Sequence, residues 1–241
     1  MNIDASAMHF QTLCRMVKEH GAREEVVIDR CTGQRYIGAG MKGGRIVING
    51  TPGNALGAYF DGDSIIVHGN AQDATGDTMN DGSIIIHGSS GDATGYAMRG
   101  GRIFVRDNTG YRAGIHMKAY LDKAPVLLVG GRAGSFLGEY QAGGTIIVLG
   151  RGAGGAVPVG DFCGTGIHGG AIYLRCQKPP ENMPEQVAVN KAAAGDLAEI
   201  SPHVEDFCAL FGFDAQTILS ETFYVLRPNK LSPYRQLYTH N

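Results

Sequence analysis

Four segments of the chain, GRIVING (residues 44–50), DSIIVHG (63–69), GSIIIHG (82–88) and GRIFVRD (101–107), repeat one pattern at a fixed step of nineteen residues. Each segment is rich in β-branched residues, which favour strands. Nineteen residues are too few for a strand and a crossover helix, but they suffice for short strands joined by tight bends. A fixed period near twenty residues is typical of a solenoid, in which each repeat stacks on the next.

Glycine recurs in the same register. Gly38, Gly57, Gly76, Gly95 and Gly114 lie nineteen residues apart, and we interpret them as structural corners, where a bend needs a positive φ or a close backbone approach. Insertions near KAYLDKAP (118–125) and RGAGGAVPVG (151–160) interrupt the spacing, and we expect Gly138 and Gly160 to continue the series. The chain has 37 glycines among 241 residues, about twice the ordinary share.

Apolar residues also line up between the corners, in three columns that predict the interior. Two columns come from the strand segments and one from the residue three places after each corner glycine: Ile46, Ile65, Ile84 and Ile103; Ile48, Val67, Ile86 and Val105; Met41, Phe60, Met79, Met98 and Met117. We therefore predict an all-β fold, a single-stranded parallel β-helix (β-solenoid) of about seven coils over residues 36–176. Residues 1–35 would form an N-terminal helix and cap, and residues 177–241 a linker and helical tail.

One further apolar column lies between the two strand columns and faces the opposite way, because side chains alternate along a strand. We call it the outer stripe and expect it to contain Val47, Ile66, Ile85, Phe104, Leu127 and Ile147. Soluble proteins rarely leave such a stripe bare. Either the termini of the chain or a partner protein would cover it, so these residues are the candidate partner-facing surface.

The termini carry helix signals. Phe10, Leu13, Cys14 and Val17 predict an amphipathic helix that ends at Gly21. Ser201 and Pro202 are expected to begin a second helix, which stops at Gly212. A short helix after Asp214, a strand at TFYVL (222–226) and a helix start at Ser232 and Pro233 should follow.

Bulk properties exclude several classes of protein. The net charge of -2 and the pI of about 6.4 give no basic face for nucleic acid or an anionic membrane. No apolar run approaches the roughly 18–20 residues of a membrane span, and no secretory signal pattern opens the chain. The cysteines are scattered and odd in number, which argues against a disulfide framework or a metal cluster and favours a cytoplasmic protein: Cys14, Cys31, Cys163, Cys176 and Cys208.

Two glycine motifs match the pattern of a dinucleotide-binding loop, Gly38-x-Gly40-x-x-Gly43 and Gly150-x-Gly152-x-x-Gly155. Such a loop must lead into a helix whose N-terminus holds the phosphate. A strand follows the first motif and a non-helical stretch follows the second. We interpret both as corners.

Stacked polar pairs are the remaining candidates for chemistry. His68 and His87 share one column, and Asp73 and Asp92 share another, so each pair should lie one strand spacing apart. No third ligand converges on either pair, and we interpret them as exposed stacked side chains. We predict no catalytic, cofactor-binding or metal-binding residue, and hence a scaffold. An independent enzyme or ligand-binding β-helix is the alternative.

Several specific motifs carry a family resemblance that covers nearly the whole chain: Gly33-Gln34-Arg35-Tyr36, Gly110-Tyr111-Arg112, His116-Met117-Lys118, Gly138-Glu139-Tyr140 and His168-Gly169-Gly170. With these motifs and its glycine-rich repeats, the chain closely resembles the C-terminal domain of the glutamate synthase large subunit. It is less similar to the glycine-rich β-helical subunit of formylmethanofuran dehydrogenase.

The resemblance implies a right-handed β-helix without catalytic residues. In glutamate synthases this domain supports an amidotransferase, which hydrolyses glutamine with an N-terminal cysteine, and an FMN and iron–sulfur barrel that makes glutamate from 2-oxoglutarate. Neither catalytic domain is present, because residue 2 is Asn and no closely spaced cysteine triplet occurs. The chain is then either one domain cut from the enzyme or the structural subunit of a split enzyme.

The expected partners are the amidotransferase and FMN synthase subunits, with FMN and the iron–sulfur cluster in those chains and no cofactor here. In isolation the chain is a candidate homo-oligomer. The alternative is a scaffold like the β-helical subunit of formylmethanofuran dehydrogenase, for which partners would carry a molybdenum or tungsten pterin.

Overall fold

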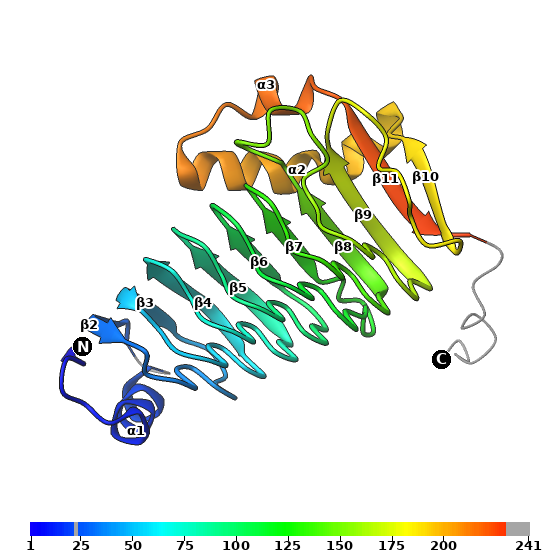
Figure 1. Cartoon of the computed structure of the whole chain (residues 1–241). Helices are drawn as coiled ribbons and strands as arrows, with labels where there is room; N and C mark the ends of the chain where they lie inside the picture. The colour runs from blue at the N-terminus through cyan, green and yellow to red at the C-terminus, as the bar shows by residue number, and fades with distance from the viewer. Residues whose placement is uncertain (22–23, 230–241) are drawn as a thin grey trace.

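The computed structural model describes residues 1–21 and 24–229 (Figure 1). Its elements, in chain order, are β1 (Asn2–Asp4), α1 (Phe10–His20), β2 (Val26–Thr32), β3 (Arg45–Thr51), β4 (Asp61–His68), β5 (Asp81–Ile86), β6 (Arg102–Val105), β7 (Val126–Val129), β8 (Ala142–Val148), β9 (Gly169–Arg175), β10 (Val187–Lys191), α2 (Ala194–Phe211), α3 (Ala215–Leu219) and β11 (Phe223–Pro228). The protein is therefore mostly β, with few helices.

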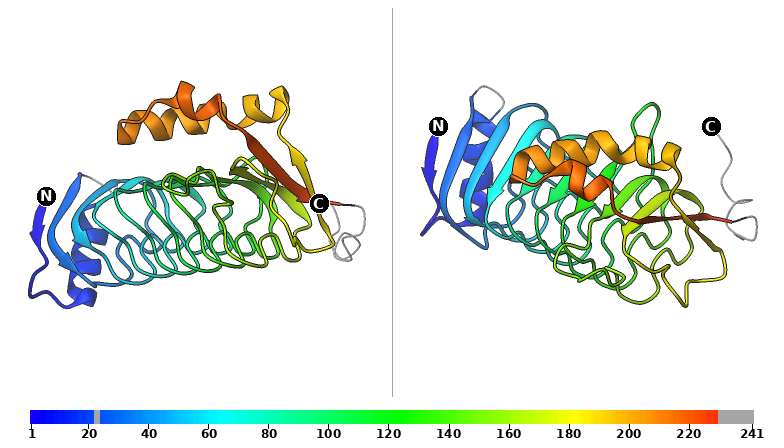
Figure 2. Two further views of the ribbon diagram at one scale, coloured as in Figure 1. Left: turned by 45° about the horizontal axis from the view of Figure 1, so that its top comes forward. Right: turned by 90° about the horizontal axis from the view of Figure 1, so that it is seen from above.

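All eleven strands join one sheet, in the order β1-β2-β3-β4-β5-β6-β7-β8-β9-β11-β10. Strands β1 to β9 are parallel to one another, and β11 is antiparallel to both β9 and β10. The sheet thus includes strands from both terminal segments and extends beyond the boundaries expected at residues 36 and 176. Figure 2 shows the connecting segments of successive repeats stacked one behind another along the sheet.

The strand register follows the predicted nineteen-residue step. Ile46 pairs with Ile65, Ile65 with Ile84, and Ile84 with Ile103. The step then lengthens, because Ile103 pairs with Leu127 across the insertion at residues 118–125. The second insertion likewise separates Ile146 from its partner Ile172. The predicted insertions are therefore confirmed as extra residues between otherwise regular repeats.

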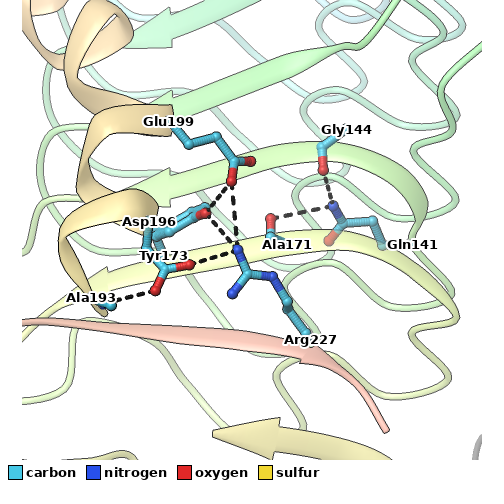
Figure 3. Close-up of polar contacts among 8 residues, drawn as sticks. All are labelled: Gln141, Gly144, Ala171, Tyr173, Ala193, Asp196, Glu199 and Arg227. Carbon is cyan, nitrogen blue, oxygen red and sulfur yellow. Dashed lines mark hydrogen bonds and ion pairs between the residues drawn. The ribbon is translucent and has the colours of Figure 1, made fainter. Parts of the chain in front are cut away.

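The three predicted interior columns form one buried cluster. Ile46, Ile65 and Met79 are fully buried, and Met41, the most accessible member, is 4% exposed. Burying each such side chain contributes about 1.5–3 kcal/mol. Gln141 follows Met117 in the third column and is also fully buried. Its side-chain amide donates hydrogen bonds to the carbonyls of Gly144 (3.0 Å) and Ala171 (3.5 Å), as Figure 3 shows.

Each repeat contains a tight turn, which we call a corner turn; the seven corner turns lie at residues 36–40, 54–59, 73–78, 92–97, 111–116, 135–140 and 161–166. The five predicted corner glycines all lie in these turns with φ between +62° and +71°. In the last corner turn the equivalent residue is Gly164 (φ +71°), not Gly160, because the second insertion is longer than the expected spacing allowed.

The residues two places before and after each corner glycine are left-handed too. In the turn at residues 54–59, Ala55, Gly57 and Tyr59 have φ of +62°, +62° and +58°. The N–H of Gly57 donates to the backbone carbonyl of Ile37 in the preceding repeat (2.8 Å). The N–H groups of Ala55 and Tyr59 donate instead to the backbone carbonyls of Asp73 and Asp77 in the following repeat. Alternating conformations therefore direct the N–H groups alternately to the two neighbouring repeats.

The terminal helices agree with the sequence in part. Helix α1 ends at Gly21 and α2 ends at Gly212, which is left-handed (φ +73°), both as predicted. The predicted short helix and strand are α3 and β11. The predicted start of α2 at Ser201 is wrong, because the helix begins at Ala194 and Pro202 lies inside it. The start predicted at Ser232 lies outside the described residues.

The upstream start of α2 has a physical reason. Asp196 accepts a hydrogen bond from the N–H of Ala193 (2.7 Å) and caps the helix there. Ile200 is fully buried and lies four residues before Val204, so the apolar face begins before the proline. Within residues 1–21 and 24–229, no helix combines the length and apolar character that crossing a membrane requires.

Candidate partner-binding surface

The outer stripe runs along one face of the sheet, with one correction. Phe104 pairs with Leu128, which in turn pairs with Ile147. The prediction of Leu127 is wrong, because the insertion before β7 is one residue longer than assumed and places Leu127 in the interior beside Ile103. The register also adds Val27 and Tyr173, so the corrected outer stripe is Val27, Val47, Ile66, Ile85, Phe104, Leu128, Ile147 and Tyr173.

Helix α2 covers the C-terminal half of the outer stripe. Phe104, Leu128 and Ile147 are fully buried in a second apolar cluster with residues of α2. The rings of Phe104 and Phe207 meet edge to face, with centroids 5.9 Å apart. Figure 2 shows α2 lying over this face, across the strands. The C-terminal segment of the chain is therefore the cover for this half.

A glycine on the sheet lets α2 approach closely. A Cβ atom at Gly130 would lie 2.7 Å from the ring of Phe207, nearer than real Cβ contacts allow. The same atom would lie 2.2 Å from the carbonyl oxygen of Arg106. A larger residue here would separate the helix from the sheet.

Polar contacts hold the N-terminal end of α2 to the last strands, as Figure 3 shows. The hydroxyl of Tyr173 donates to Glu199 Oε2 (2.8 Å) and accepts a hydrogen bond from Arg227 Nη2 (3.0 Å). Arg227 also pairs with Asp196 at 2.8 Å. We call these four residues the latch, since they join α2, β9 and β11.

The pKa values of Asp196 and Tyr173 in the latch are shifted in opposite directions. The N–H of Ala193 and, after it, the guanidinium of Arg227 hold the pKa of Asp196 below its usual value. Burial and the neighbouring Glu199 raise the pKa of Tyr173, so its hydroxyl stays protonated and remains a donor. The latch therefore favours a charged Asp196 and a neutral Tyr173.

Within residues 1–21 and 24–229, no helix covers the N-terminal end of the outer stripe. Val27, Val47 and Ile66 are only half-buried, and we call them the open end of the stripe. Helix α2 ends before them, where the ring of Phe211 meets His87 edge to face at 5.0 Å.

Polar side chains border the open end on both sides. Arg45 pairs with Glu25 (2.7 Å), and the side-chain amide of Asn49 donates to Asp29 (2.7 Å). A small apolar centre with a polar border is the usual anatomy of a protein–protein interface.

The predicted polar pairs lie as neighbours on adjacent repeats. The rings of His68 and His87 have centroids 4.7 Å apart. Asp73 Oδ1 accepts a hydrogen bond from the N–H of Asp92 (2.9 Å), so this column of aspartates ties one corner turn to the next. Among the described residues no group of three potential ligands is placed to hold a metal ion.

The five cysteines are free thiols. Burial raises the pKa of Cys31 to about 11, of Cys163 to about 12 and of Cys176 to about 11, and it raises the pKa of Cys14 and Cys208 as well. A thiol with a raised pKa carries little of the thiolate that acts as nucleophile or metal ligand.

Neither glycine motif leads into a helix. The first motif ends at Gly43, two residues before β3 begins, and residues 156–160 after the second motif are non-helical, with Val159 in a β-bridge. Cover by a terminal segment was one of the two expected alternatives, and α2 provides it for the C-terminal half of the stripe. The latch was not predicted, because it joins residues 26 and 54 positions apart that share no spacing pattern.

Comparisons with known proteins agree with this architecture. A family model described as GXGXG motif matches residues 25–229. The uncharacterized protein MJ1350 of Methanocaldococcus jannaschii is 43% identical over 249 aligned positions, which span 98% of this chain and 95% of that protein.

Proposed function

Because the chain belongs to the GXGXG motif family, the family of the glutamate synthase C-terminal domain, we propose that it is the structural, non-catalytic part of a glutamate synthase. In this role it scaffolds an amidotransferase and an FMN synthase that together convert glutamine and 2-oxoglutarate to glutamate. The match over residues 25–229 carries the proposal, since it spans strands β2 to β11 and the covering helix α2 together.

The scaffold itself is proposed to be a right-handed β-helix of about seven coils. The nineteen-residue register, the stacked corner turns and the isolated bridges between them, such as Ala71 with Ser90 and Ser90 with Thr109, support this architecture. A rigid stack whose repeats bond to both neighbours suits a part that fixes other domains in place.

We assign FMN and the iron–sulfur cluster to the partner chains. The cysteines of this chain lie on different elements, with Cys14 on α1, Cys31 on β2 and Cys208 on α2, so they do not offer the clustered thiolates that a cluster needs. The chemistry of the complex is then electron transfer and amide hydrolysis in its partners, and positioning in this chain.

We place one partner contact at the open end of the stripe. Val27, Val47 and Ile66 are half-buried there, whereas the stripe from Phe104 to Tyr173 packs against α2. The sequence also makes the C-terminal tail a candidate partner contact, and this tail falls mainly on residues 230–241, outside the described part of the chain.

Affinity capture from the source cells tests the function. The tagged chain should recover a glutamine-hydrolysing chain and a chain with flavin absorbance, and the complex should form glutamate from glutamine and 2-oxoglutarate. Recovery of partners with a molybdenum or tungsten pterin would contradict the glutamate synthase proposal and favour a role like that of the β-helical subunit of formylmethanofuran dehydrogenase. Flavin binding or glutamine turnover by the isolated chain would contradict a purely structural role.

A further inference from the structure

A hollow of about 570 Å³ lies between α1 and the first corner turn, at the N-terminal end of the sheet. Cys14, Arg15 and Lys18 of α1 line one side, and Tyr36 and Met41 line the other. The volume lies within the range of pockets that enclose a ligand or a protruding side chain. Figure 1 shows α1 beside the first strands, far along the sheet from α2.

The border of the hollow is mainly cationic. Arg15 and Lys18 are exposed, and neither forms an ion pair within residues 1–21 and 24–229. Glu19 is the one carboxylate among the lining residues. The guanidinium of Arg35 lies nearby, 4.4 Å from the centroid of the Phe10 ring and 5.7 Å from that of Tyr36.

Tyr36 holds an unusual conformation at this border. Its φ is +63°, in the left-handed region that bulky residues rarely adopt, and 47% of its surface is exposed. The equivalent positions of the next three corner turns carry Ala55, Ala74 and Ala93. The last three corner turns carry Arg112, Phe136 and Phe162 at this position. Beside the hollow, an exposed ring held in a strained conformation points to a contact made by the ring.

We propose that this hollow is a socket for a segment of a partner chain, one that presents an apolar side chain flanked by carboxylates. The apolar side chain would enter against Met41 and Tyr36, and the carboxylates would pair with Arg15 and Lys18. Aromatic and arginine side chains around a small pocket are the residues that carry most binding energy in protein interfaces. The charge of the border selects an acidic segment over a basic one.

The inference rests on the proposed function, since it names a surface that the flavin-containing partner of the complex binds. The test measures the affinity of the purified flavin-containing partner for the chain, by biolayer interferometry at about 0.1 M salt. The double variant Arg15→Glu/Lys18→Glu is expected to bind at least about tenfold more weakly. The variant Ala39→Leu, which narrows the hollow without changing charge, should also bind more weakly.

A matched control separates local from general charge effects. Arg132→Glu/Lys178→Glu makes the same change of net charge at exposed residues outside the hollow and should bind like wild type. Equal melting temperatures of all variants establish that each is folded. If wild type binds the flavin-containing partner and both hollow variants bind equally well, the socket is wrong while the proposed function stands. If wild type binds no such partner, the proposed function fails and the socket fails with it.

Discussion

At the scale of single residues, the corner turns depend on three left-handed residues that alternate with ordinary ones. Gly95 has a φ of +71°, and a Cβ atom there would have its nearest neighbour, Ile103, at 3.7 Å, which is ordinary contact. Gly76 has the same conformation, but its Cβ would lie 2.3 Å from Ile103. At Gly95 the left-handed conformation alone therefore disfavours a β-branched residue, whereas at Gly76 any Cβ atom would also collide with Ile103.

The variant Gly95→Val tests the conformational requirement. A β-branched residue in the left-handed region is strained by at least about 2 kcal/mol, so we expect a loss of that size in the free energy of unfolding. Gly195→Ala is the matched control, because Gly195 lies in α2 with ordinary φ and open space around it. The control should melt no lower than wild type. Denaturant unfolding measures both, and full stability of Gly95→Val would count against the stacked-turn architecture.

The cysteines provide a second test at this scale. Because burial raises the pKa of Cys31, Cys163 and Cys176 to about 11, 12 and 11, the folded chain should react very slowly with a thiol reagent at pH 8. All five cysteines should react after denaturation. A rapid reaction of a buried cysteine in the folded chain would show that its repeat opens readily.

Sequence periodicity predicted single residues well only inside the regular repeats. The columns of Ile46 and Met41 follow from a constant step, which side-chain alternation converts into an inside and an outside face. Past residue 118 the spacing between repeats changes. Because the insertion is one residue longer than the sequence pattern indicated, Leu127 was assigned to the outer stripe although this residue lies in the interior. Only the strand pairing fixes the length of an insertion, so sequence alone could not assign Leu128.

At the scale of elements, α2 converts an exposed apolar stripe into a second core. Its N-terminal end is fixed by the latch and its middle by packing of Phe207 against the sheet. The stop at Gly212 was predictable because a glycine cap is a local signal. The start of α2 at Ala194 was not predictable, because Ser201-Pro202 is itself a local signal for a helix start. The contacts that extend the helix upstream of it involve Arg227, which lies on the distant strand β11.

The latch predicts a pH dependence. The folded-state pKa of Asp196 is lowered, so its contribution to stability is present above the unfolded pKa and is lost as the pH falls through the lower folded value. The difference in free energy of unfolding between wild type and Asp196→Asn should therefore be largest near neutral pH and shrink below about pH 4. Other carboxylates titrate in both proteins and cancel in the difference. A constant difference from pH 7 to pH 3 would show that the charge of Asp196, held by the Ala193 N–H and by Arg227, does not stabilise the fold.

At the scale of the whole molecule, the two ends differ. The C-terminal half of the outer stripe is covered from within the chain, and β11 and β10 close that edge of the sheet with antiparallel pairing. The N-terminal half keeps both the open end of the stripe and the hollow beside α1. Among the described residues, only the C-terminal end of the sheet face is covered by the chain itself, which fits the proposed docking of a partner at the N-terminal end.

The open end gives the last prediction. A charge at Ile66 would be desolvated when a partner covers the stripe, so Ile66→Asp should weaken partner binding by at least about tenfold. The isolated chain should lose little stability, because Ile66 is already half-exposed at the sheet surface. Leu121→Asp is the control, since Leu121 is 86% exposed on the inserted loop, away from the stripe. Co-purification of the flavin-containing partner with each variant, set against its melting temperature, measures the effect. Equal recovery with Ile66→Asp and Leu121→Asp would place the partner elsewhere and leave the socket beside α1 as the contact to test.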